Sequence, residues 1–553
     1  MAHGGKLLVD CLVALGAKKA FGVPGESYLP VLDAMHDTGG VFDYVLCRQE
    51  GGAGFMAAAW GKLTGAPGIC MVTRGPGATN ASIGVHTAMQ DSSPMILLVG
   101  QVGTDMKGRE AFQELDYRAV FGTMAKWVVE IDRVERIPEL IARAWTTAVS
   151  GRPGPVVVAV PEDVLSATTE VAPLPGPFRI AEPAPDAAAV EAALALLAGA
   201  NRPLALIGGG AWTEDGKAAF QHFAEASNLP VLTAFRFQDR FDNHSPVYAG
   251  EAGVGMLPHA RRLMSEADVI LALNVRFGEN TTGGYELLSV PIPKQRLIHV
   301  HVSGAEVGKI YQAEVGLVAG PNAFARALRP VQGQWADWTR AARGDFEKSF
   351  DLPDQPPPVD MRQVMAQLQH GLDEDAILTN GAGNFAIWPN KLFRFGPRQR
   401  LIAPQSGSMG YGLPAAIAAG LACPGRQVIC FAGDGDFQMT SQELATAVQA
   451  GVRPVVLLLN NGIYGTIRAH QERRFPARVS GTTMVSPDFP ALARAHGLHG
   501  ERVESTEAFA PAFARALAAP KGALLDIAIS PEALSPRVTL SAMRAAGLEA
   551  KRP

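Results

Sequence analysis

The stretch Val428-Ile-Cys-Phe-Ala-Gly-Asp-Gly-Asp-Phe437 joins an apolar run to a Gly-Asp-Gly turn, and the later run Pro454-Val-Val-Leu-Leu-Leu459 ends at Asn460-Asn461. The spacing predicts a strand, a connecting helix and a second parallel strand, so that the two strand ends lie side by side. The glycines of the turn let the backbone approach a phosphate closely, and a helix N-terminus attracts an anion. Asp434 and Asn461 offer the carboxylate and amide oxygens that Mg²⁺ prefers. An isolated Gly-Asp-Gly is more often an ordinary strand-end turn, but this frame favours a Mg²⁺-held diphosphate.

The connecting helix is expected to begin within Thr440-Ser-Gln-Glu443, which fits a capping box. In that motif the first hydroxyl and the fourth side chain satisfy each other's backbone N–H groups.

Composition places the chain among globular enzymes. It has 553 residues, 47% of them hydrophobic and 18% charged, with a net charge of −4, so nothing indicates nucleic acid. The five cysteines are scattered and form no C-x-x-C pair, which argues against a disulfide framework or a zinc site. No targeting segment and no apolar stretch of membrane-spanning length is present. We expect a cytoplasmic protein with no membrane partner.

Short apolar runs alternate with Ala/Leu-rich helical stretches along the whole chain, a pattern that predicts βαβ units and an α/β fold. Pro-rich stretches at 172–185 and 351–358 divide it. We expect three domains, each an open, mostly parallel sheet flanked by helices, at residues 1–170, 190–335 and 360–535, and a tail at 536–553 that is too short for a long lid. The first and last domains share an order of small-residue helix, strand and Gly-rich turn, as diverged copies would. The runs taken as buried strands include 68–73, 94–100, 155–160, 203–208 and 268–273.

Further motifs fall in a recognisable order: Phe21-Gly-Val-Pro-Gly25, Arg48-Gln-Glu-Gly-Gly-Ala-Gly54, Gly75-Pro-Gly-Ala-Thr-Asn80, Ala111-Phe-Gln-Glu114, Ser150-Gly-Arg-Pro-Gly-Pro155 and Gly407-Ser-Met-Gly-Tyr-Gly-Leu-Pro-Ala-Ala416. Together with the Gly-Asp-Gly and Asn-Asn segments, they resemble the thiamin diphosphate-dependent enzymes over nearly the whole chain. Within that superfamily the chain is most similar to the acetohydroxyacid (acetolactate) synthase large subunit. The resemblance implies a pyrimidine-binding, a central and a diphosphate-binding domain, in that order.

The resemblance implies catalytic roles for Glu50, Gln113 and Glu26. Glu50 would hydrogen-bond N1′ of the cofactor's aminopyrimidine, although an isolated Glu at a helix start is usually a solvated charge. Gln113 matches the active-site glutamine of the synthases. Glu26 stands where the synthases usually have Gly and simple decarboxylases have a proton-relaying Asp. It points toward protonation and aldehyde release, while the absence of adjacent histidines favours carboligation.

The cofactor-binding set implied by the resemblance is Gly383, Asn384, Gly407, Met409, Gly433, Asp434, Gly435, Asp436, Asn461, Ile463 and Gly465. Asp434, Asn461 and the Ile463 backbone carbonyl would bind Mg²⁺. Met409 would hold the cofactor in its bent shape, with a gap-filling core Met as the alternative. Phe385 stands where the family has a histidine donor.

The substrate site departs from the synthases. Tyr28, His86, Thr466 and His470 are the candidate substrate contacts, and Arg468, His470, Arg473 and Arg474 would make a basic approach or, alternatively, a solvated helix face. In the central domain, Gly208-Gly-Gly210 follows a strand and is by itself weak evidence for a nucleotide. Val275-Arg-Phe277 resembles part of the FAD site of the synthases, but Phe235 and Phe237 are larger than the family's residues there. Whether FAD binds is left open.

The leading hypothesis is decarboxylation of a pyruvate-like 2-oxo acid, followed by carboligation of the enamine to a second carbonyl. A non-ligating 2-oxoacid decarboxylase or aldehyde lyase is the alternative, and a non-catalytic protein that binds thiamin diphosphate is a third reading. The family architecture implies a homodimer or homotetramer with each active site between two subunits. The sequence does not decide whether a regulatory subunit binds.

Overall fold

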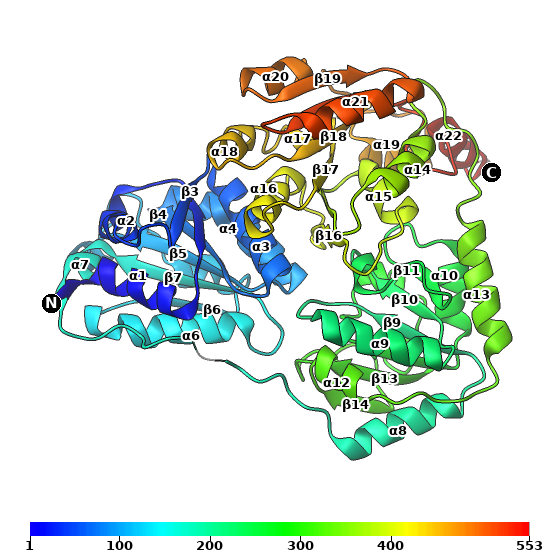
Figure 1. The fold of residues 1–553 in the computed structure, drawn as a ribbon, viewed down its shortest axis with the longest axis horizontal. Coiled ribbons are helices and arrows are strands. Elements are labelled where there is room, and N and C mark those ends of the chain that lie inside the picture. The colour runs from blue at the N-terminus through cyan, green and yellow to red at the C-terminus, as the bar shows by residue number, and fades with distance from the viewer. Residues whose placement is uncertain (178, 552–553) are drawn as a thin grey trace.

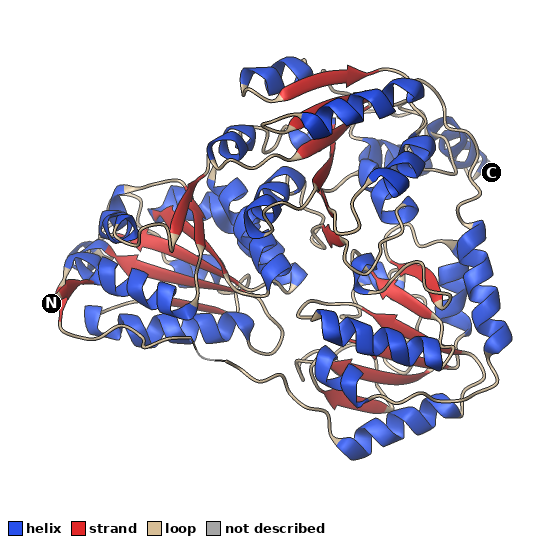
Figure 2. Ribbon diagram, viewed as in Figure 1, coloured by secondary structure: helices blue, strands red, loops and turns tan. Residues whose placement is uncertain are grey.

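Three six-stranded parallel sheets organise the chain, each covered by helices on both faces (Figures 1 and 2). The structure, a computed structural model, describes residues 1–177 and 179–551. The predicted α/β class with three parallel-sheet domains is confirmed. Because both faces of each sheet are covered, the strands are almost continuously apolar, which explains why the runs could be recognised in the sequence.

The first domain has the strand order β3-β2-β4-β5-β7-β6. A two-stranded ribbon of β1 and β8 lies beside this sheet. The strands are β1 (Ala2–His3), β2 (Lys19–Gly22), β3 (Asp43–Leu46), β4 (Gly68–Thr73), β5 (Met95–Gln101), β6 (Trp127–Glu130), β7 (Pro155–Pro161) and β8 (Thr168–Thr169). The helices are α1 (Gly4–Leu15), α2 (Leu29–His36), α3 (Glu50–Thr64), α4 (Arg74–Asp91), α5 (Tyr117–Phe121), α6 (Ile137–Val149) and α7 (Glu162–Ser166). Helices α1 and α6 cover one face, and α3 and α4 cover the other.

The third domain repeats this topology, with the order β16-β15-β17-β18-β20-β19. The strands are β15 (Ile377–Asn380), β16 (Arg400–Ile402), β17 (Val428–Gly433), β18 (Val455–Asn460), β19 (His499–Val503) and β20 (Ala523–Ala528). The helices are α14 (Met361–Gly371), α15 (Ile387–Leu392), α16 (Gly412–Ala422), α17 (Asp434–Phe437), α18 (Glu443–Gln449), α19 (Gly465–Arg474), α20 (Phe489–Ala495), α21 (Thr506–Ala518) and α22 (Leu540–Glu549). In both sheets the strand order reverses between the first and third strands of the sheet, β2 and β4 or β15 and β17, the position where open α/β sheets bind ligands. The equal order agrees with the two domains' shared sequence pattern.

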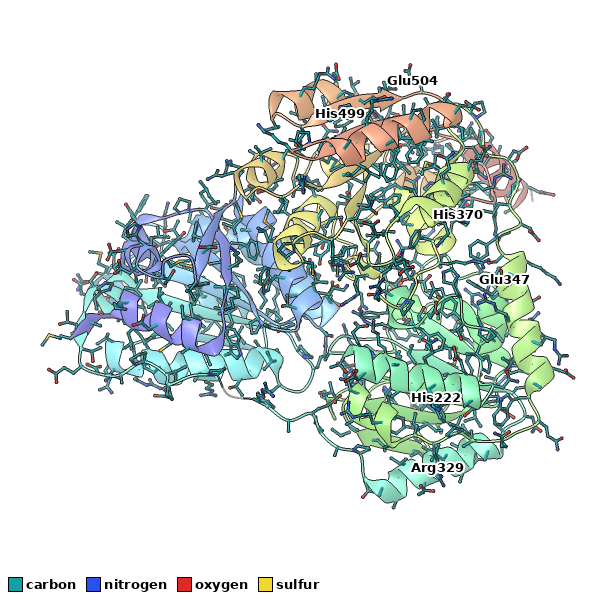
Figure 3. The ribbon with its side chains drawn as sticks, viewed as in Figure 1. His222, Arg329, Glu347, His370, His499 and Glu504 are labelled. Carbon is teal, nitrogen blue, oxygen red and sulfur yellow. The ribbon has the colours of Figure 1, made fainter. Side chains whose placement is uncertain are left out.

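The central domain differs, with the order β11-β10-β9-β12-β13-β14, which is that of dinucleotide-binding sheets. Its strands are β9 (Pro203–Ile207), β10 (Val231–Ala234), β11 (Tyr248–Ala252), β12 (Val269–Leu273), β13 (Arg296–His301) and β14 (Val315–Val318). Its helices are α8 (Ala187–Ala198), α9 (Glu214–Ala226), α10 (Pro258–Glu266), α11 (Glu279–Thr282), α12 (Pro321–Ala327) and α13 (Ala336–Lys348). Helix α13 lies beyond the predicted domain end at 335 and packs here through Ala342 and Phe346. Its Glu347, labelled in Figure 3, accepts hydrogen bonds from Arg394 of the third domain.

The first and third domains share one hydrophobic core. Helix α16 lies directly against α3 (Figure 1), and residues of both helices belong to a single buried cluster, with Phe55 edge-on to Tyr411. Helices α3 and α4 cross at Gly54 and Gly84, where a Cβ on Gly84 would lie 2.5 Å from the Gly54 backbone. The two domains therefore form one packed unit around three helices.

The predicted capping box at Thr440–Glu443 is wrong. The Thr440 hydroxyl donates to the Gly410 carbonyl, and Glu443 is fully buried against the first domain. Both side chains bond to groups outside the helix, and α18 begins at Glu443 without a side-chain cap. Over the described residues, no helix is both long and apolar enough to cross a bilayer.

Candidate functional site

A cavity of about 210 Å³ opens at the carboxyl ends of β15, β17 and β18, where the third-domain sheet reverses its strand order. Its walls come from the loops after these three strands, from the loop between β16 and α16, and from the start of α19. All eleven predicted cofactor-binding residues line it, together with Thr466 of the predicted substrate set. Gly383 and Gly465, which are 82 positions apart, thus lie at one place, and Asp434 and Asn461 lie at neighbouring strand ends, as the strand–helix–strand reasoning requires.

Asp434 is the buried carboxylate of this cavity, with 3% of its surface exposed. Its Oδ1 accepts the Gly435 N–H at 3.1 Å, and its Oδ2 accepts the Gly462 N–H at 2.8 Å. Burial raises the pKa of Asp434, and the two backbone N–H groups oppose that rise. A divalent cation at the carboxylate would offset the desolvation that raises this pKa.

The Asn461–Ile463 turn is held by a short antiparallel bridge to the segment after α19. Ile463 pairs with Thr483, and the Met484 N–H donates to the Gly462 carbonyl at 2.9 Å. Arg468 anchors that segment, because its Nε and Nη2 donate to the hydroxyls of Thr482 and Thr483. Arg468 is buried, so its predicted place in a basic approach to the substrate is wrong; the guanidinium is used to fix the loop.

Asp436 ties three loops of the cavity together. Its Oδ1 accepts the N–H groups of Ala382 at 3.0 Å and of Gly410 at 2.9 Å. The side chain is buried, and desolvation raises its pKa to about 7. An added Cβ on Gly381 would lie 2.1 Å from Oδ1, so a glycine is needed for this approach. Asp436 thus lines the cavity and also joins its loops, a joining role that the sequence pattern did not indicate.

The glycines of the turn serve the protein's own packing as well. A Cβ on Gly433 would lie 2.6 Å from the Phe385 ring, and a Cβ on Gly435 would lie 2.6 Å from the Tyr464 ring. Phe385 therefore acts as an apolar support beneath the turn. Asn384 Nδ2 is buried and has no hydrogen-bond partner among the described residues. An unsatisfied buried donor on the cavity wall fits a phosphate acceptor.

Glu50 is the first residue of α3 and is half-buried. Asn80 Nδ2, on the neighbouring helix α4, donates to its Oε2 at 2.9 Å. A fixed, partly desolvated carboxylate is what a proton-holding role requires. Glu50 does not line the third-domain cavity of its own chain.

Glu26 lies at the first domain's reversal point, between the ends of β2 and β4. The Arg74 guanidinium lies at this reversal point. Its Nη1 donates to Glu26 at 3.1 Å, and its Nη2 donates to Glu162 at 2.9 Å. The corresponding position of the third domain is the open cavity. Gln113 lies close to this pair, with a φ of +65°, and its carbonyl accepts the Gly75 N–H.

The substrate candidates divide into two groups. Thr466 and His470 lie exposed on α19, at and beyond the cavity, and His86 is exposed on α4. Tyr28 is 3% exposed in the first-domain core, and its hydroxyl donates to the Val23 carbonyl and bonds with Tyr44. The structure therefore contradicts a substrate contact for Tyr28, whose hydroxyl is already satisfied internally.

The tail folds back onto the site. Helix α22 packs on α19, where the buried Glu472 accepts two hydrogen bonds from Arg544, at 2.9 and 2.6 Å. Gly547 lies so close to α19 that a Cβ would be 2.5 Å from the Glu472 carbonyl oxygen. The tail thus supports the helix that bears Thr466 and His470.

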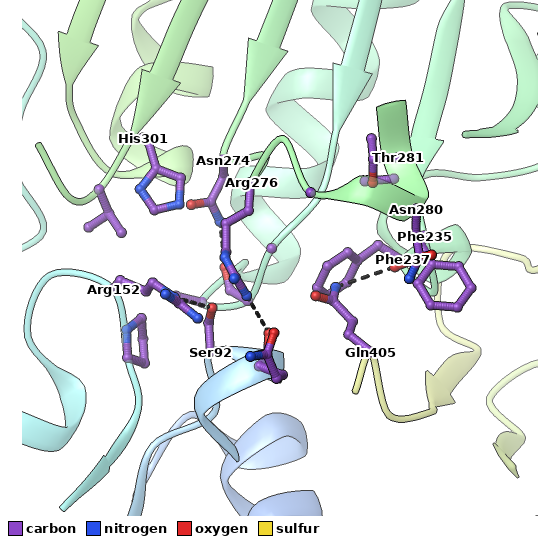
Figure 4. A pocket seen from close by; sticks show the side chains of 18 of the residues that line it. Ser92, Arg152, Phe235, Phe237, Asn274, Arg276, Asn280, Thr281, His301 and Gln405 are labelled. Carbon is purple, nitrogen blue, oxygen red and sulfur yellow. Dashed lines mark hydrogen bonds between the residues drawn. The ribbon is translucent and has the colours of Figure 1, made fainter. Parts of the chain in front are cut away.

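A second cavity, of about 300 Å³, lies where all three domains meet, at the reversal point between β9 and β12 of the central sheet. Figure 4 shows Arg152, Asn274 and Arg276 on one side of it and Phe235 and Gln405 on the other. Arg152 Nε donates to Ser92, and Arg276 Nη1 donates to the Gln90 carbonyl. Arg152 Nη1 also donates to Glu306 at 3.2 Å, while burial and the neighbouring Arg276 lower the pKa of Arg152 to about 10.

Comparison with known proteins agrees with this geometry. Residues 2–120 match the N-terminal TPP binding domain of thiamine pyrophosphate enzymes, residues 190–328 match the central domain, and residues 381–527 match the C-terminal TPP binding domain. The acetolactate synthase large subunit of Parasynechococcus marenigrum is 33% identical over 95% of this chain and 87% of its own length. The acetolactate synthase isozyme 2 large subunit of Escherichia coli is 33% identical over 91% of each chain. A probable acetolactate synthase large subunit of Methanocaldococcus jannaschii is 31% identical over 97% and 93%.

Proposed function

Because this chain belongs to the thiamine pyrophosphate enzyme family and is a thiamin diphosphate-dependent transferase, we propose that it decarboxylates a pyruvate-like 2-oxo acid and joins the remaining fragment to a second carbonyl. The observation that supports this most is the third-domain cavity, in which the eleven cofactor-binding residues implied by the resemblance meet. The relatives' name, acetolactate synthase, supports the ligating outcome.

We propose that Mg²⁺ is bound by the Asp434 carboxylate, the Asn461 amide oxygen and the Ile463 backbone carbonyl. Asn384 Nδ2 would donate to the diphosphate, which supplies the partner that this buried donor lacks. Met409 lies on the cavity wall, where a long apolar side chain can support the ring system. Thiamin diphosphate supplies the carbanion chemistry when bound.

The protein's own part is to orient groups and hold protons. Glu50 would hold the proton at N1′ of the aminopyrimidine, and Asn80 keeps the carboxylate oriented through its hydrogen bond. Since Glu50 does not line the cavity of its own chain, the cavity would be completed by a second copy, which makes a dimer the minimal active unit. Light scattering of the active species tests this, and an active monomer would refute it.

The structure bears on the choice between ligation and simple decarboxylation. The Arg74 guanidinium occupies the Glu26 carboxylate, and Arg74 is fixed in turn by Glu162. Among the described residues, Arg74 bonds only Oε1 of Glu26, so the ion pair orients this exposed carboxylate and leaves Oε2 free. Ligation is the favoured outcome because the relatives are named acetolactate synthase, with aldehyde release by a 2-oxoacid decarboxylase or lyase as the alternative.

Mass spectrometry of the products from pyruvate and a panel of other 2-oxo acids and aldehydes tests the proposal. Acetolactate or acetoin supports ligation, and acetaldehyde alone supports the alternative. Glu50→Gln is the matched control, because it changes one atom of the carboxylate. If no 2-oxo acid is consumed by the wild type, the enzymatic reading fails and a binding role remains.

We also propose that the cavity between the three domains binds a dinucleotide, with FAD as the candidate. The strand order, the two half-buried arginines and the unsatisfied Arg276 Nε favour a diphosphate there. Phe235 and Phe237 narrow the end nearest Gln405 and could stack on a ring. The absorbance spectrum of the purified protein near 450 nm tests for flavin, and a colourless protein that binds ADP would identify a different nucleotide.

The relatives are named large subunits, which supports the further proposal that a smaller regulatory chain binds this one. Native mass spectrometry of the complex isolated from its source organism tests this; a homo-oligomer alone would count against it.

A further inference from the structure

The turn that presents Glu50 is held by the third domain of the same chain. Glu443 is the first residue of α18, is fully buried, and reaches across the domain boundary. Both of its carboxylate oxygens accept the Arg48 N–H, at 3.2 and 3.3 Å. Arg48 lies two residues before Glu50.

The contact between Glu443 and the β3–α3 turn is supported by Gly52 of the first domain and by Thr446 of the third. Gly52, in the first turn of α3, lies over the carboxylate, and an added Cβ there would be 2.7 Å from Glu443 Oε1. The Thr446 hydroxyl donates to Glu443 Oε2 at 2.6 Å, and its oxygen lies 3.3 Å from the Leu46 carbonyl oxygen. The β3–α3 turn is thus held from the end of β3 to the first turn of α3.

The position of the Glu443 carboxylate is also electrostatically favourable. Glu443 lies at the N-terminus of the 15-residue helix α3, where the helix dipole favours an anion. Burial raises the pKa of Glu443, while the Thr446 hydroxyl and the N–H groups of Arg48 and Gln49 oppose the rise. A carboxylate that is buried without a full cationic partner is expensive to keep, which indicates a function for it.

We propose that Glu443 is a positioning residue for Glu50: it fixes the Arg48–Gly52 turn so that the Glu50 carboxylate is presented to the cofactor ring. This rests on the proposed role of Glu50. Helix α18 follows directly on the Gly433–Phe437 turn of the cavity, so one short segment supports both the diphosphate loop of its own site and the carboxylate offered to the other copy.

The test compares full-length Glu443→Gln, Glu50→Gln and Gln449→Ala proteins with wild type, each saturated with thiamin diphosphate and Mg²⁺. The readout is the rate of hydrogen–deuterium exchange at C2 of the bound cofactor, measured by acid quench and NMR. Affinity for thiamin diphosphate and the thermal midpoint of the cofactor-free protein are measured beside it. Gln449→Ala is the matched control, since it removes only the contact of α18 with the Arg48 guanidinium at 2.7 Å.

We expect Glu50→Gln to slow exchange by about 100-fold or more. Glu443→Gln keeps the size and one acceptor but loses the charge, and we expect it to slow exchange by about tenfold, with cofactor affinity changed by less than about threefold. Gln449→Ala should stay within about twofold of wild type in all three measurements.

Wild-type exchange in Glu443→Gln, with Glu50→Gln inactive, would overturn the positioning role alone. Unchanged exchange in Glu50→Gln would overturn the proposed function itself. If Glu443→Gln does not fold, Gly52→Ala tests the same contact from the other side, because its Cβ displaces the carboxylate without removing it. Wild-type exchange in folded Gly52→Ala would equally overturn the inference.

Discussion

The shared core makes a testable prediction about the buried Lys62, near the C-terminal end of α3. Its Nζ donates to Asp91 Oδ2 at 3.0 Å and to the Ala403 carbonyl of the third domain. Only 2% of the Lys62 side chain and 1% of the Asp91 side chain are exposed. Lys62→Met would keep the apolar stem and leave Asp91 buried without its cation. Removing one partner of such a pair costs about 3–5 kcal/mol, because the remaining charge is uncompensated.

Two variants make the reasoning testable. In Lys62→Met/Asp91→Asn, the neutral amide still accepts the Gln405 N–H, which Asp91 Oδ1 accepts at 2.6 Å, so the double variant should lose only about 1–2 kcal/mol. Lys6→Met removes the exposed Lys6–Asp10 pair and should cost about 0.5 kcal/mol or less. Urea unfolding followed by tryptophan fluorescence gives the free energies for the first transition. A Lys62→Met protein within about 1 kcal/mol of wild type, or a double variant no better than the single, would refute the argument.

Three further outcomes are expected. Asp434→Asn should raise the Mg²⁺ concentration needed for half-maximal activity by about 10–100-fold, and an unchanged requirement would remove Asp434 from the metal site. Gly435→Ala places a Cβ 2.6 Å from the Tyr464 ring and should weaken thiamin diphosphate binding by about tenfold or more in a titration, whereas Gly435→Ala/Tyr464→Leu should recover part of it. Burial lowers the pKa of His301 to about 4, so its stabilising effect is complete above the unfolded pKa of 6.5 and is lost as pH falls toward 4. Between pH 7 and pH 5 this is worth about 2 kcal/mol, and His301→Asn should show a smaller fall in thermal midpoint over that range than wild type.

Much of the fold was readable because its strands are buried on both faces. The predicted runs 68–73 and 155–160 coincide with β4 and β7 to within one residue, since apolar strands bounded by Gly or Pro have few competing readings. The predicted end of the central domain, residue 335, lies before α13. The amphipathic pattern of α13 predicts a helix but does not show which domain the helix packs on. The burial of Ala342 and Phe346 in the central domain follows only from tertiary packing.

The Gly433–Asp436 turn and Asn461 could be predicted from the chain itself, because they follow strand ends directly, whereas the other cavity residues were implied by the family resemblance. The errors arose where a side chain had two possible partners. Thr440 and Arg468 bond to distant loops instead of serving as a helix cap and a substrate contact. Tyr28 is satisfied within the core. Asp436 and Glu443 were not predicted to support other residues, since their partners lie 26 to 395 positions away and leave no local signal.

The core shared by α3 and α16 has a consequence for how the chain is made. The apolar face of α3 is complete once residue 64 has emerged, yet α16 begins only at residue 412. At synthesis rates of about 5–20 residues per second, that face waits roughly 20–70 s for its partner. During this interval the nascent N-terminal third exposes a surface of small residues that can pack closely against a helix, including a helix of another molecule. Slow translation, or a truncation before residue 412, should therefore favour aggregation of an otherwise well-formed first sheet, and chaperone dependence should end when α16 docks.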